Sequence, residues 1–148
     1  MSLAMSVYGG ACHCGAVSAR FETAIAPDQI DVRADQCGFC RRHGAKTVSD
    51  PAGRLALSFR EAAVERYRFG TRLSDFIVCR ACGAYVAAII EGYGVLNVVG
   101  ADVRAFADKP ARPVSYEDET GEVRGYAFFV AYVVKPSGPK PRPIIRVG

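Results

Sequence analysis

Hydrophobic and polar residues alternate with a period of two in several short segments of the chain. Val17, Ala19 and Phe21 alternate with polar neighbours, and similar patterns recur at 30–34 and 55–59. Because a period of two places alternate side chains on one face of a strand, each segment predicts a half-buried strand. Runs of β-branched or aromatic residues predict further strands at 67–69, 76–78, 85–90, 95–99 and 126–134.

Helical periodicity is scarce along the chain. The segments 61–66 and 102–107 are the best helical candidates, and either can equally be a turn. Short strands separated by breaks rich in Gly, Pro or Asp are typical of an antiparallel all-β architecture rather than of βαβ units. We therefore expect a mainly β fold of antiparallel sheets with few short helices, and an exposed loop at 118–122 before the last strand.

Length and composition favour a single domain. The chain has 148 residues, of which 50% are hydrophobic and 23% charged. This length suits one core, and this balance argues against a disordered or fibrous chain. We expect one domain at 8–134, an N-terminal extension at 1–7 and a basic, Pro-rich tail at 135–148.

Apolar runs and charge restrict the expected location and partners. The longest apolar stretches, near 84–90 and 127–134, are far shorter than the ~20 residues of a transmembrane helix, so we expect no membrane contact. The first residues lack a basic segment followed by an apolar run, which predicts a cytoplasmic protein. A net charge of +4 fits a solvated surface, and no aromatic residue interleaves the basic tail, so nucleic acid is not the expected partner. The pattern favours no particular oligomeric state.

The six cysteines form three close pairs, namely Cys12/Cys14, Cys37/Cys40 and Cys79/Cys82. Close pairing is how a chain presents two thiolates to one metal ion. A glycine follows both the first and the third pair, and it permits the positive φ that closes such a turn. These two pairs together predict a tetrahedral structural zinc site, with buried, metal-free cysteines as the alternative. His13 should project away from a metal held by its two neighbours.

The middle pair lies in a segment with further candidate ligands. Asp35, Cys37 and Cys40 offer a carboxylate and two thiolates, and His43 follows three residues later. On a short helical turn His43 can face the same point as the cysteines, although a lone His is more often a surface residue. Three ligands leave one position open for a water or a substrate thiolate, as in catalytic zinc sites.

Three cysteine motifs follow one another along the chain, namely Gly10-Ala-Cys-His-Cys-Gly-Ala-Val17, Cys37-Gly-Phe-Cys-Arg-Arg-His-Gly44 and Cys79-Arg-Ala-Cys-Gly83. In this order they resemble the motifs of the glutathione-dependent formaldehyde-activating enzyme family, which includes the centromere protein V domain. The resemblance runs from about residue 8 to about residue 103. It implies a zinc-bearing β-tent fold. It also implies a structural zinc on Cys12, Cys14, Cys79 and Cys82, and a second zinc at the middle motif, where active members bind glutathione and form or break a carbon–sulfur bond to an aldehyde carbon.

One position departs from the pattern of the family. Its middle motif is Cys-x-Cys-x-x-Cys, and this chain has Asp35 in place of the first cysteine. A carboxylate can bind zinc, so Asp35, Cys37 and Cys40 can form an open three-ligand site of harder character than three sulfurs. The alternative is a site of low affinity that persists as a metal-free dithiol.

Three functions are compatible with these residues. The first is a carbon–sulfur lyase, similar to S-(hydroxymethyl)glutathione synthase. It would use Cys37 and Cys40 on an adduct of glutathione or another small thiol with an aldehyde, and Arg41 or Arg42 would hold a substrate carboxylate. The second is a zinc-stabilised binding module whose middle motif has degenerated. The third is a dithiol oxidoreductase, which Asp50 and Pro51 disfavour because they leave no room for the long helix such a motif opens.

Overall fold

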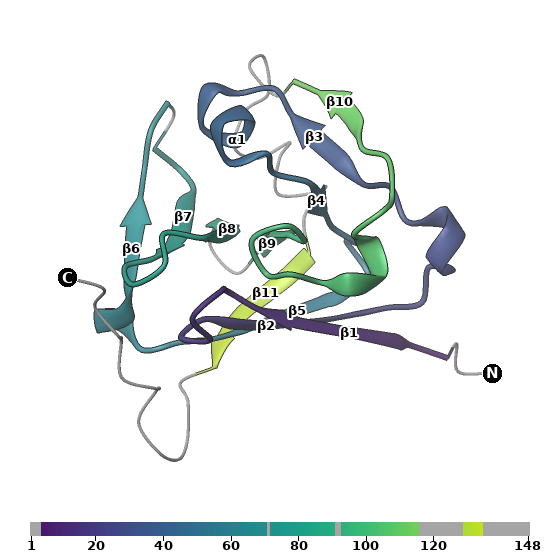
Figure 1. The fold of residues 1–148 in the computed structure, drawn as a ribbon. Coiled ribbons are helices and arrows are strands. Elements are labelled where there is room, and N and C mark those ends of the chain that lie inside the picture. The colour runs from purple at the N-terminus through teal and green to yellow at the C-terminus, as the bar shows by residue number, and fades with distance from the viewer. Residues whose placement is uncertain (1–3, 71, 91–92, 116–128, 135–148) are drawn as a thin grey trace.

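Strands dominate the computed structural model, which describes residues 4–70, 72–90, 93–115 and 129–134 (Figure 1). The strands are β1 (Ser6–Ala11), β2 (Ser18–Thr23), β3 (Arg33–Asp35), β4 (Thr47–Val48), β5 (Arg54–Ser58), β6 (Val64–Tyr67), β7 (Asp75–Cys79), β8 (Tyr85–Ile90), β9 (Tyr93–Asn97), β10 (Arg112–Val114) and β11 (Phe129–Val134). The described residues contain one α-helix, α1 (Gly38–His43), and 3-10 turns at Pro27–Gln29, Glu61–Ala63 and Arg104–Phe106. The mainly β class expected from the sequence is confirmed.

The sheet forks at β9. One edge of β9 pairs with β8, which continues through β7 to β6. The other edge pairs with β11 at Tyr93 and Gly94, and with β4 at Leu96 and Asn97. From this fork one branch runs through β11, β5, β2 and β1, and the other through β4, β3 and β10. Figure 1 shows the first branch crossing below the second, with β6 and β7 at one side.

The expectation of purely antiparallel pairing needs correction. β3 pairs in parallel with β10, and β5 pairs in parallel with β11. Each of these partners lies far from the other in the sequence. Parallel pairing requires a long connection of that kind, whereas turn signals report only on neighbouring strands. The described sheet is therefore mixed.

The central strand β8 separates two hydrophobic clusters. Val86 and Ala87 belong to the larger one, which fills the space between the branches with buried side chains that include Val17, Phe21, Leu55, Leu57, Phe59, Ile77, Leu96 and Phe106. Tyr85 and Ala88 belong to a smaller cluster with Cys40, Ala45, Ile90 and Val95. The register between β7 and β8 shifts at Ile77/Val78, beside the point where Tyr85 enters the smaller cluster.

Most alternating segments form the expected strands. Residues 17, 19, 21, 55, 57 and 59 are all buried, and β8 has the bounds predicted at 85–90. The segment 30–34 has strand structure only from Arg33, and the segment 67–69 only at Tyr67. β1, β4 and β10 were not predicted. They lack alternation because β1 contains two glycines and the other two strands are very short.

Each of the two segments predicted as helical candidates contains only a single 3-10 turn. Residues 61–66 divide between a turn at Glu61–Ala63 and the start of β6, because Val64 pairs with Cys79. Within 102–107 only Arg104–Phe106 are helical. The loop at 118–122 and the tail at 135–148 lie outside the described residues, as does the first part of the strand predicted at 126–134. No helix among the described residues is long and apolar enough to cross a membrane.

Candidate metal centres

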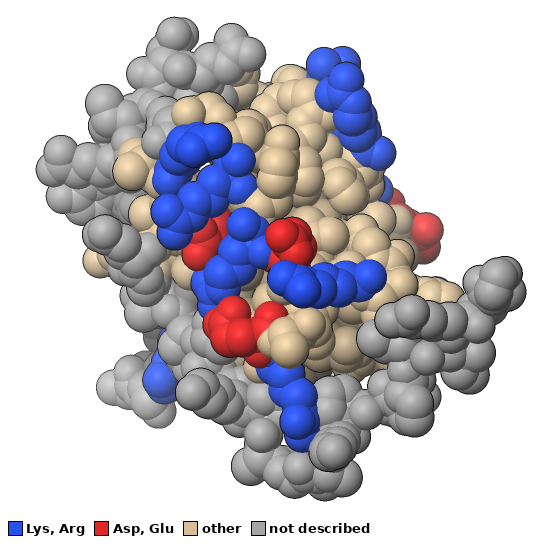
Figure 2. Space-filling view, turned by 90° about the vertical axis from the view of Figure 1, so that its left-hand side faces the viewer, with Lys and Arg blue, Asp and Glu red and all other residues tan. Residues whose placement is uncertain are grey.

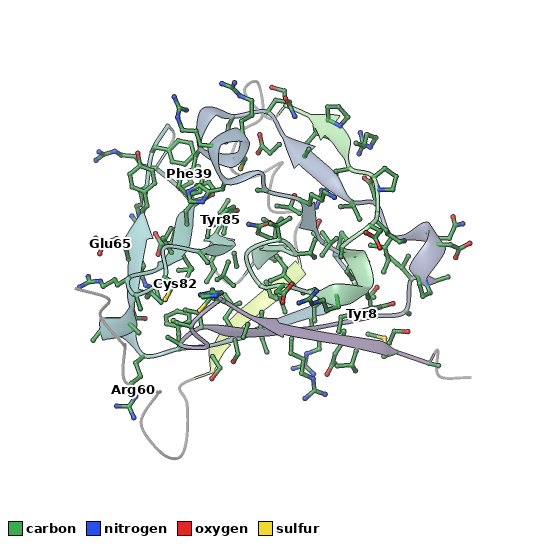
Figure 3. All side chains as sticks on the ribbon, viewed as in Figure 1. Tyr8, Phe39, Arg60, Glu65, Cys82 and Tyr85 are labelled. Carbon is green, nitrogen blue, oxygen red and sulfur yellow. The ribbon has the colours of Figure 1, made fainter. Side chains whose placement is uncertain are left out.

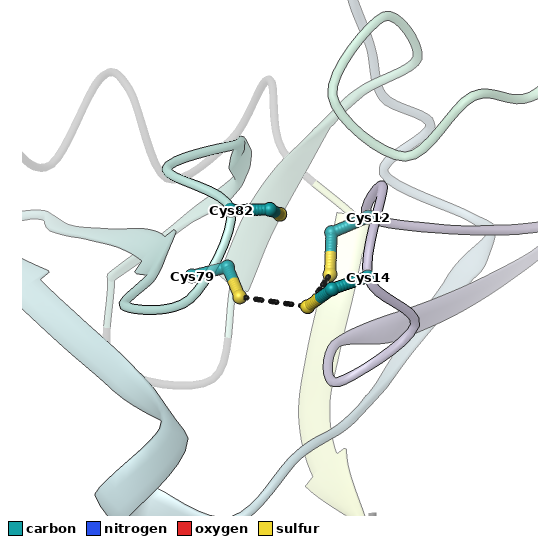
Figure 4. A group of neighbouring side chains, drawn as sticks. All are labelled: Cys12, Cys14, Cys79 and Cys82. Atoms are coloured by element: carbon teal, nitrogen blue, oxygen red, sulfur yellow. Dashed lines mark hydrogen bonds between the residues drawn. The ribbon is translucent and has the colours of Figure 1, made fainter. Parts of the chain in front are cut away.

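Four cysteines from distant parts of the chain converge on one point (Figure 4). Cys12 and Cys14 lie in the turn between β1 and β2, Cys79 is the last residue of β7, and Cys82 lies in the turn between β7 and β8. Their sulfur atoms all lie within 4.8 Å of one another. The first and third pairs of the sequence thus form one group, as predicted.

The two turns that present these cysteines have similar backbone geometry. Cys12 N–H donates to the carbonyl of Val17, and Cys79 N–H donates to the carbonyl of Ala84, at 2.8 and 2.9 Å. Gly15 and Gly83 close the turns with φ of 85° and 78°. Such positive φ values are accessible to glycine without steric cost, which explains the glycine after each pair.

Backbone donors and burial set the protonation of the four thiols. The N–H of Val17 donates to Cys12 Sγ at 3.3 Å. Burial raises the pKa of the Cys12 thiol, and burial also raises the pKa of Cys79 to about 12. Burial acts in the same direction on Cys82, but hydrogen bonds from the N–H groups of Ala84 and Cys14, together with those from the Cys79 and Cys12 side chains, lower the pKa of Cys82 to about 7. One thiolate is therefore accessible near neutral pH to begin metal capture.

The sulfur positions fit a tetrahedral metal. A Zn–S bond of about 2.3 Å implies sulfur–sulfur separations of about 3.8 Å in a tetrahedron. Cys12 Sγ lies 3.7 Å from Cys14 Sγ, and Cys14 Sγ lies 3.4 Å from Cys79 Sγ. All six cysteines are free thiols. This four-cysteine group can hold a metal ion with no protein ligand missing.

A second group joins the end of β3 to the start of α1. Asp35 is the last residue of β3, Cys37 is the N-cap of α1, and Cys40 lies within the helix. One ligand atom of each lies within 4.8 Å of the others. No helical candidate predicted from the sequence covers this segment, and α1 ends at Gly44, whose φ of 58° lies in the left-handed region. The three-residue group can also hold a metal ion.

Hydrogen bonds within this group make Cys37 the more acidic thiol. Cys37 N–H donates to Asp35 Oδ1 at 2.9 Å, and Cys40 N–H donates to Cys37 Sγ at 3.3 Å. A hydrogen bond from the Cys40 side chain, helped by helix N–H groups, lowers the pKa of Cys37 to about 7. The same side-chain hydrogen bond and burial raise the pKa of Cys40. At neutral pH the pair therefore shares one proton.

The remaining sequence candidates lie beside the two groups. His43 belongs to neither, because its ring packs on Phe39 with centroids 4.5 Å apart. His13 is exposed, as predicted. Arg41 and Arg42 are exposed and donate to the backbone carbonyls of Gln36 and Gly38, at 3.0 and 2.9 Å, which ties both side chains to the start of α1.

An aromatic cluster adjoins the second group, and it was not identified from the sequence. Phe39, between the two cysteines, is its hub and contacts five rings, those of His43, Tyr67, Phe69, Phe76 and Tyr85. The sequence signal was available, because Phe39 lies within the motif and Tyr85 begins the strand that follows Cys82. Figure 3 shows Phe39 and Tyr85 close together beneath α1.

Charges on the outer face of β6 and β7 are paired. Arg66 and Arg68 both contact Asp75, Arg66 also contacts Glu61, and Arg80 contacts Glu65. Figure 2 shows basic and acidic side chains interleaved on this face. Exposed ion pairs of this kind add little stability.

Comparison with known proteins provides a structural relative and no function. No family model matches the chain, and no curated protein sequence matches it. A crystal structure of a Rhodobacter sphaeroides protein is similar, with 29% sequence identity and a TM-score of 0.51. The alignment covers 72% of this chain and 99% of that one. The description of that protein names no activity.

Proposed function

We propose that this protein is a zinc-dependent enzyme of the carbon–sulfur lyase type, acting on adducts of glutathione or another small thiol with an aldehyde. The observation that carries the proposal is the difference between the two metal groups. One offers four sulfurs and no vacancy, whereas the other offers three ligands, Asp35, Cys37 and Cys40. This contrast separates structural from catalytic zinc sites in proteins. The resemblance of the three cysteine motifs to formaldehyde-activating enzymes supports the same division.

The four-cysteine group has a structural role in this proposal. It ties the β1–β2 turn to the β7–β8 turn, and Cys12 and Cys79 are themselves buried members of the larger hydrophobic cluster. Metal binding at such a group is coupled to folding, because the unfolded chain does not bring the four sulfurs together. The metal therefore fixes the position of β8, which borders the second group.

The three-residue group would hold the reacting sulfur. A zinc ion bound there supplies positive charge that lowers the pKa of a substrate thiol. A hydrogen bond from the Cys40 side chain, helped by helix N–H groups, lowers the pKa of Cys37 to about 7. Asp35 Oδ2 is the carboxylate oxygen left for a metal once Oδ1 has accepted from Cys37 N–H. In the synthetic direction the thiol sulfur bonds to the carbonyl carbon, the C=O π bond breaks, and the thiol proton ends on the oxygen. Cleavage of the adduct reverses these changes.

Arg41 and Arg42 are placed to bind the carboxylates of a thiol such as glutathione. Both are exposed, and each uses one N–H group to contact the backbone near Cys37. A guanidinium has five N–H donors, so each retains several for a substrate anion.

An exchange assay tests the proposal. The purified protein should accelerate the interconversion of free aldehyde, thiol and adduct, measured by NMR exchange with formaldehyde and glutathione. Cys37→Ser should reduce the rate to that of the uncatalysed reaction, whereas the control His13→Ala, at an exposed position beside the other metal group, should keep it. Equal rates with and without wild-type protein would reject the proposal.

A zinc-stabilised binding module is the second candidate, and one contact favours it. Asp35 Oδ1 already accepts a hydrogen bond from Cys37 N–H, so the carboxylate is partly committed to the turn rather than to a metal. The second group would then remain a dithiol. This candidate predicts one zinc per chain, no thiol–aldehyde exchange, and unchanged zinc content in Cys37→Ser.

A further inference from the structure

Four aromatic rings that remain partly exposed adjoin the second metal group, and we call Phe39, Tyr67, Phe69 and Phe76 the aromatic patch. The ring of Phe39 contacts the other three in that order, at centroid distances of 5.5, 5.5 and 4.9 Å. Tyr67 is 47% exposed, and the other three side chains are only partly buried. Rings that serve core packing alone are normally covered, whereas contiguous exposed apolar surface often marks an interaction site.

Alternation in the β6–β7 hairpin separates the aromatic patch from the charges of the same strands. Arg66 and Arg68, which flank Tyr67, both contact Asp75, at 3.0 and 2.5 Å. Tyr67 pairs with Phe76 across the hairpin, so these two rings lie on the same face. The ion pairs keep both guanidinium groups on the other face. The hairpin therefore presents rings, and not charges, to Phe39 of α1.

Phe39 makes the aromatic patch continuous with the second metal group. It lies between Cys37 and Cys40, and the N–H of Cys40 donates to Cys37 Sγ at 3.3 Å, so one turn of α1 holds both the ring and the two sulfurs. Phe39, Phe76 and Cys37 all pack against the hydrophobic cluster that contains Cys40. Figure 3 shows Phe39 at α1, on the side of β6 and β7. The patch therefore begins where the sulfur of an adduct would be held.

We propose that the aromatic patch binds the aldehyde-derived part of the adduct, and that the preferred substrates are adducts of aldehydes that carry an aromatic ring. This inference rests on the proposed function. The carbon of a formaldehyde adduct carries only hydrogen atoms besides its sulfur and oxygen, so it offers nothing that four rings could bind. A phenyl substituent would bury its area against them and gain the additional attraction of aromatic pairs.

The chemistry and the charges of the site fit a small molecule as the occupant. The thiol sulfur bonds to the carbonyl carbon, the C=O π bond breaks and the thiol proton ends on the oxygen, so the ring takes no part in the bond changes. Arg41 and Arg42 are exposed on the same helix as Phe39 and can bind the carboxylates of the thiol. One adduct can therefore use the arginines, the metal group and the aromatic patch together.

Two aldehydes that differ by one phenyl ring test the inference. The kcat/KM for exchange with glutathione is measured by NMR for phenylacetaldehyde and for acetaldehyde, and wild type should prefer phenylacetaldehyde. Tyr67→Ser should lower this preference about tenfold, mainly through KM, because a ring contact and its buried area are lost. Its rate with acetaldehyde should not change.

Two control variants accompany Tyr67→Ser. Tyr67→Phe keeps the ring and should keep the preference, and Val7→Ser removes an equally exposed apolar side chain from β1 and should also keep it. The same preference in wild type and Tyr67→Ser overturns the inference. An equal fall of both rates in Tyr67→Ser also overturns it, because that result shows a structural role for Tyr67.

Unreactive ligands separate this inference from the proposed function. Zinc-loaded protein is titrated by calorimetry with S-benzylglutathione and with S-methylglutathione, which differ by one phenyl ring. Wild type should bind the benzyl compound about tenfold more tightly, and Tyr67→Ser should lose most of this difference. Equal affinities in the wild type, or binding of neither compound, overturn the inference, and sedimentation at rising concentration then shows whether a second copy of the chain covers the patch. Absence of exchange with either aldehyde overturns the proposed function, while the benzyl preference still decides whether the patch binds an aromatic ring.

Discussion

The sulfur atoms of Cys14 and Cys79 lie 3.4 Å apart although the residues are separated by 65 positions in the chain. This contact joins the first hairpin to the turn that starts the central strand. We expect metal binding at the four-cysteine group around this contact to stabilise this region, because the unfolded chain does not bring the four sulfurs together.

Removing one ligand of this group should loosen the domain. Cys79→Ser should lose one zinc per chain and lower the melting temperature by 10 °C or more, because metal binding and folding are coupled at structural zinc sites. Elemental analysis and circular dichroism measure the two effects. His13→Ala, next to Cys12 and exposed, is the control and should change neither. A stable Cys79→Ser variant with unchanged zinc content would contradict the structural role.

The reactivity of Cys37 should follow its lowered pKa. Once the second group has been emptied by mild chelation, alkylation of Cys37 by iodoacetamide should rise with pH around pH 7 rather than around pH 9, because only the thiolate reacts. Cys40→Ala removes the hydrogen bond that contributes most to this shift, so the midpoint should move to higher pH. Mass spectrometry of the alkylated peptide gives both curves. A midpoint near pH 9 in the wild type would contradict the arrangement.

Asp35 should set the metal affinity of the second group. Asp35→Cys restores a third sulfur ligand and should bind the second zinc more tightly, whereas Asp35→Ala should lose it, since two thiolates alone make a weak site. Competition with a chromophoric chelator measures both affinities. Equal affinity in wild type and Asp35→Ala would show that the carboxylate is not a ligand.

Two adjacent glycines in β1 should respond differently to alanine. A Cβ at Gly10 would lie 2.0 Å from the carbonyl oxygen of Ala101, whereas a Cβ at Gly9 would meet nothing closer than 3.7 Å. Gly10→Ala should therefore lower the free energy of unfolding by about 1–3 kcal/mol, the usual cost of overpacking. Gly9→Ala should be neutral or slightly stabilising. Chemical denaturation measures the free energy of unfolding of both variants, and equal values would contradict this packing.

Alternation of hydrophobic and polar residues predicted the strands that have one buried and one exposed face. It did not predict the strands and pairings that depend on contacts between distant parts of the chain. The alternation at 17–21 identified β2 because one face of that strand is fully buried. β4 has two residues, both buried, so it carries no period to detect. The parallel pairing of β5 with β11 depends on a long connection, about which turn residues contain no information.

The parts of the candidate site whose ligands are close in sequence could be predicted from the sequence. Cysteine spacing identified each close pair, because turns and helix starts bring residues two or three positions apart to the same point. The glycine that follows the first and the third pair led to the prediction that these two pairs share one metal. Spacing alone left the role of His43 open, and in the structure its ring lies in the aromatic cluster, in contact with Phe39 and Tyr85. The proximity of Tyr85 to Cys40 could not be predicted from the sequence, because it arises from the packing of β8 against α1.

Zinc content per chain tests the central claim most directly. Wild type and the Cys37→Ser/Cys40→Ser variant are purified side by side without added metal or chelator, and zinc is measured by elemental analysis against protein concentration. Our account predicts two zinc ions in the wild type and one in the variant, with the fold retained. One zinc ion in both proteins would contradict a metal-bearing second group and leave the binding module as the better explanation.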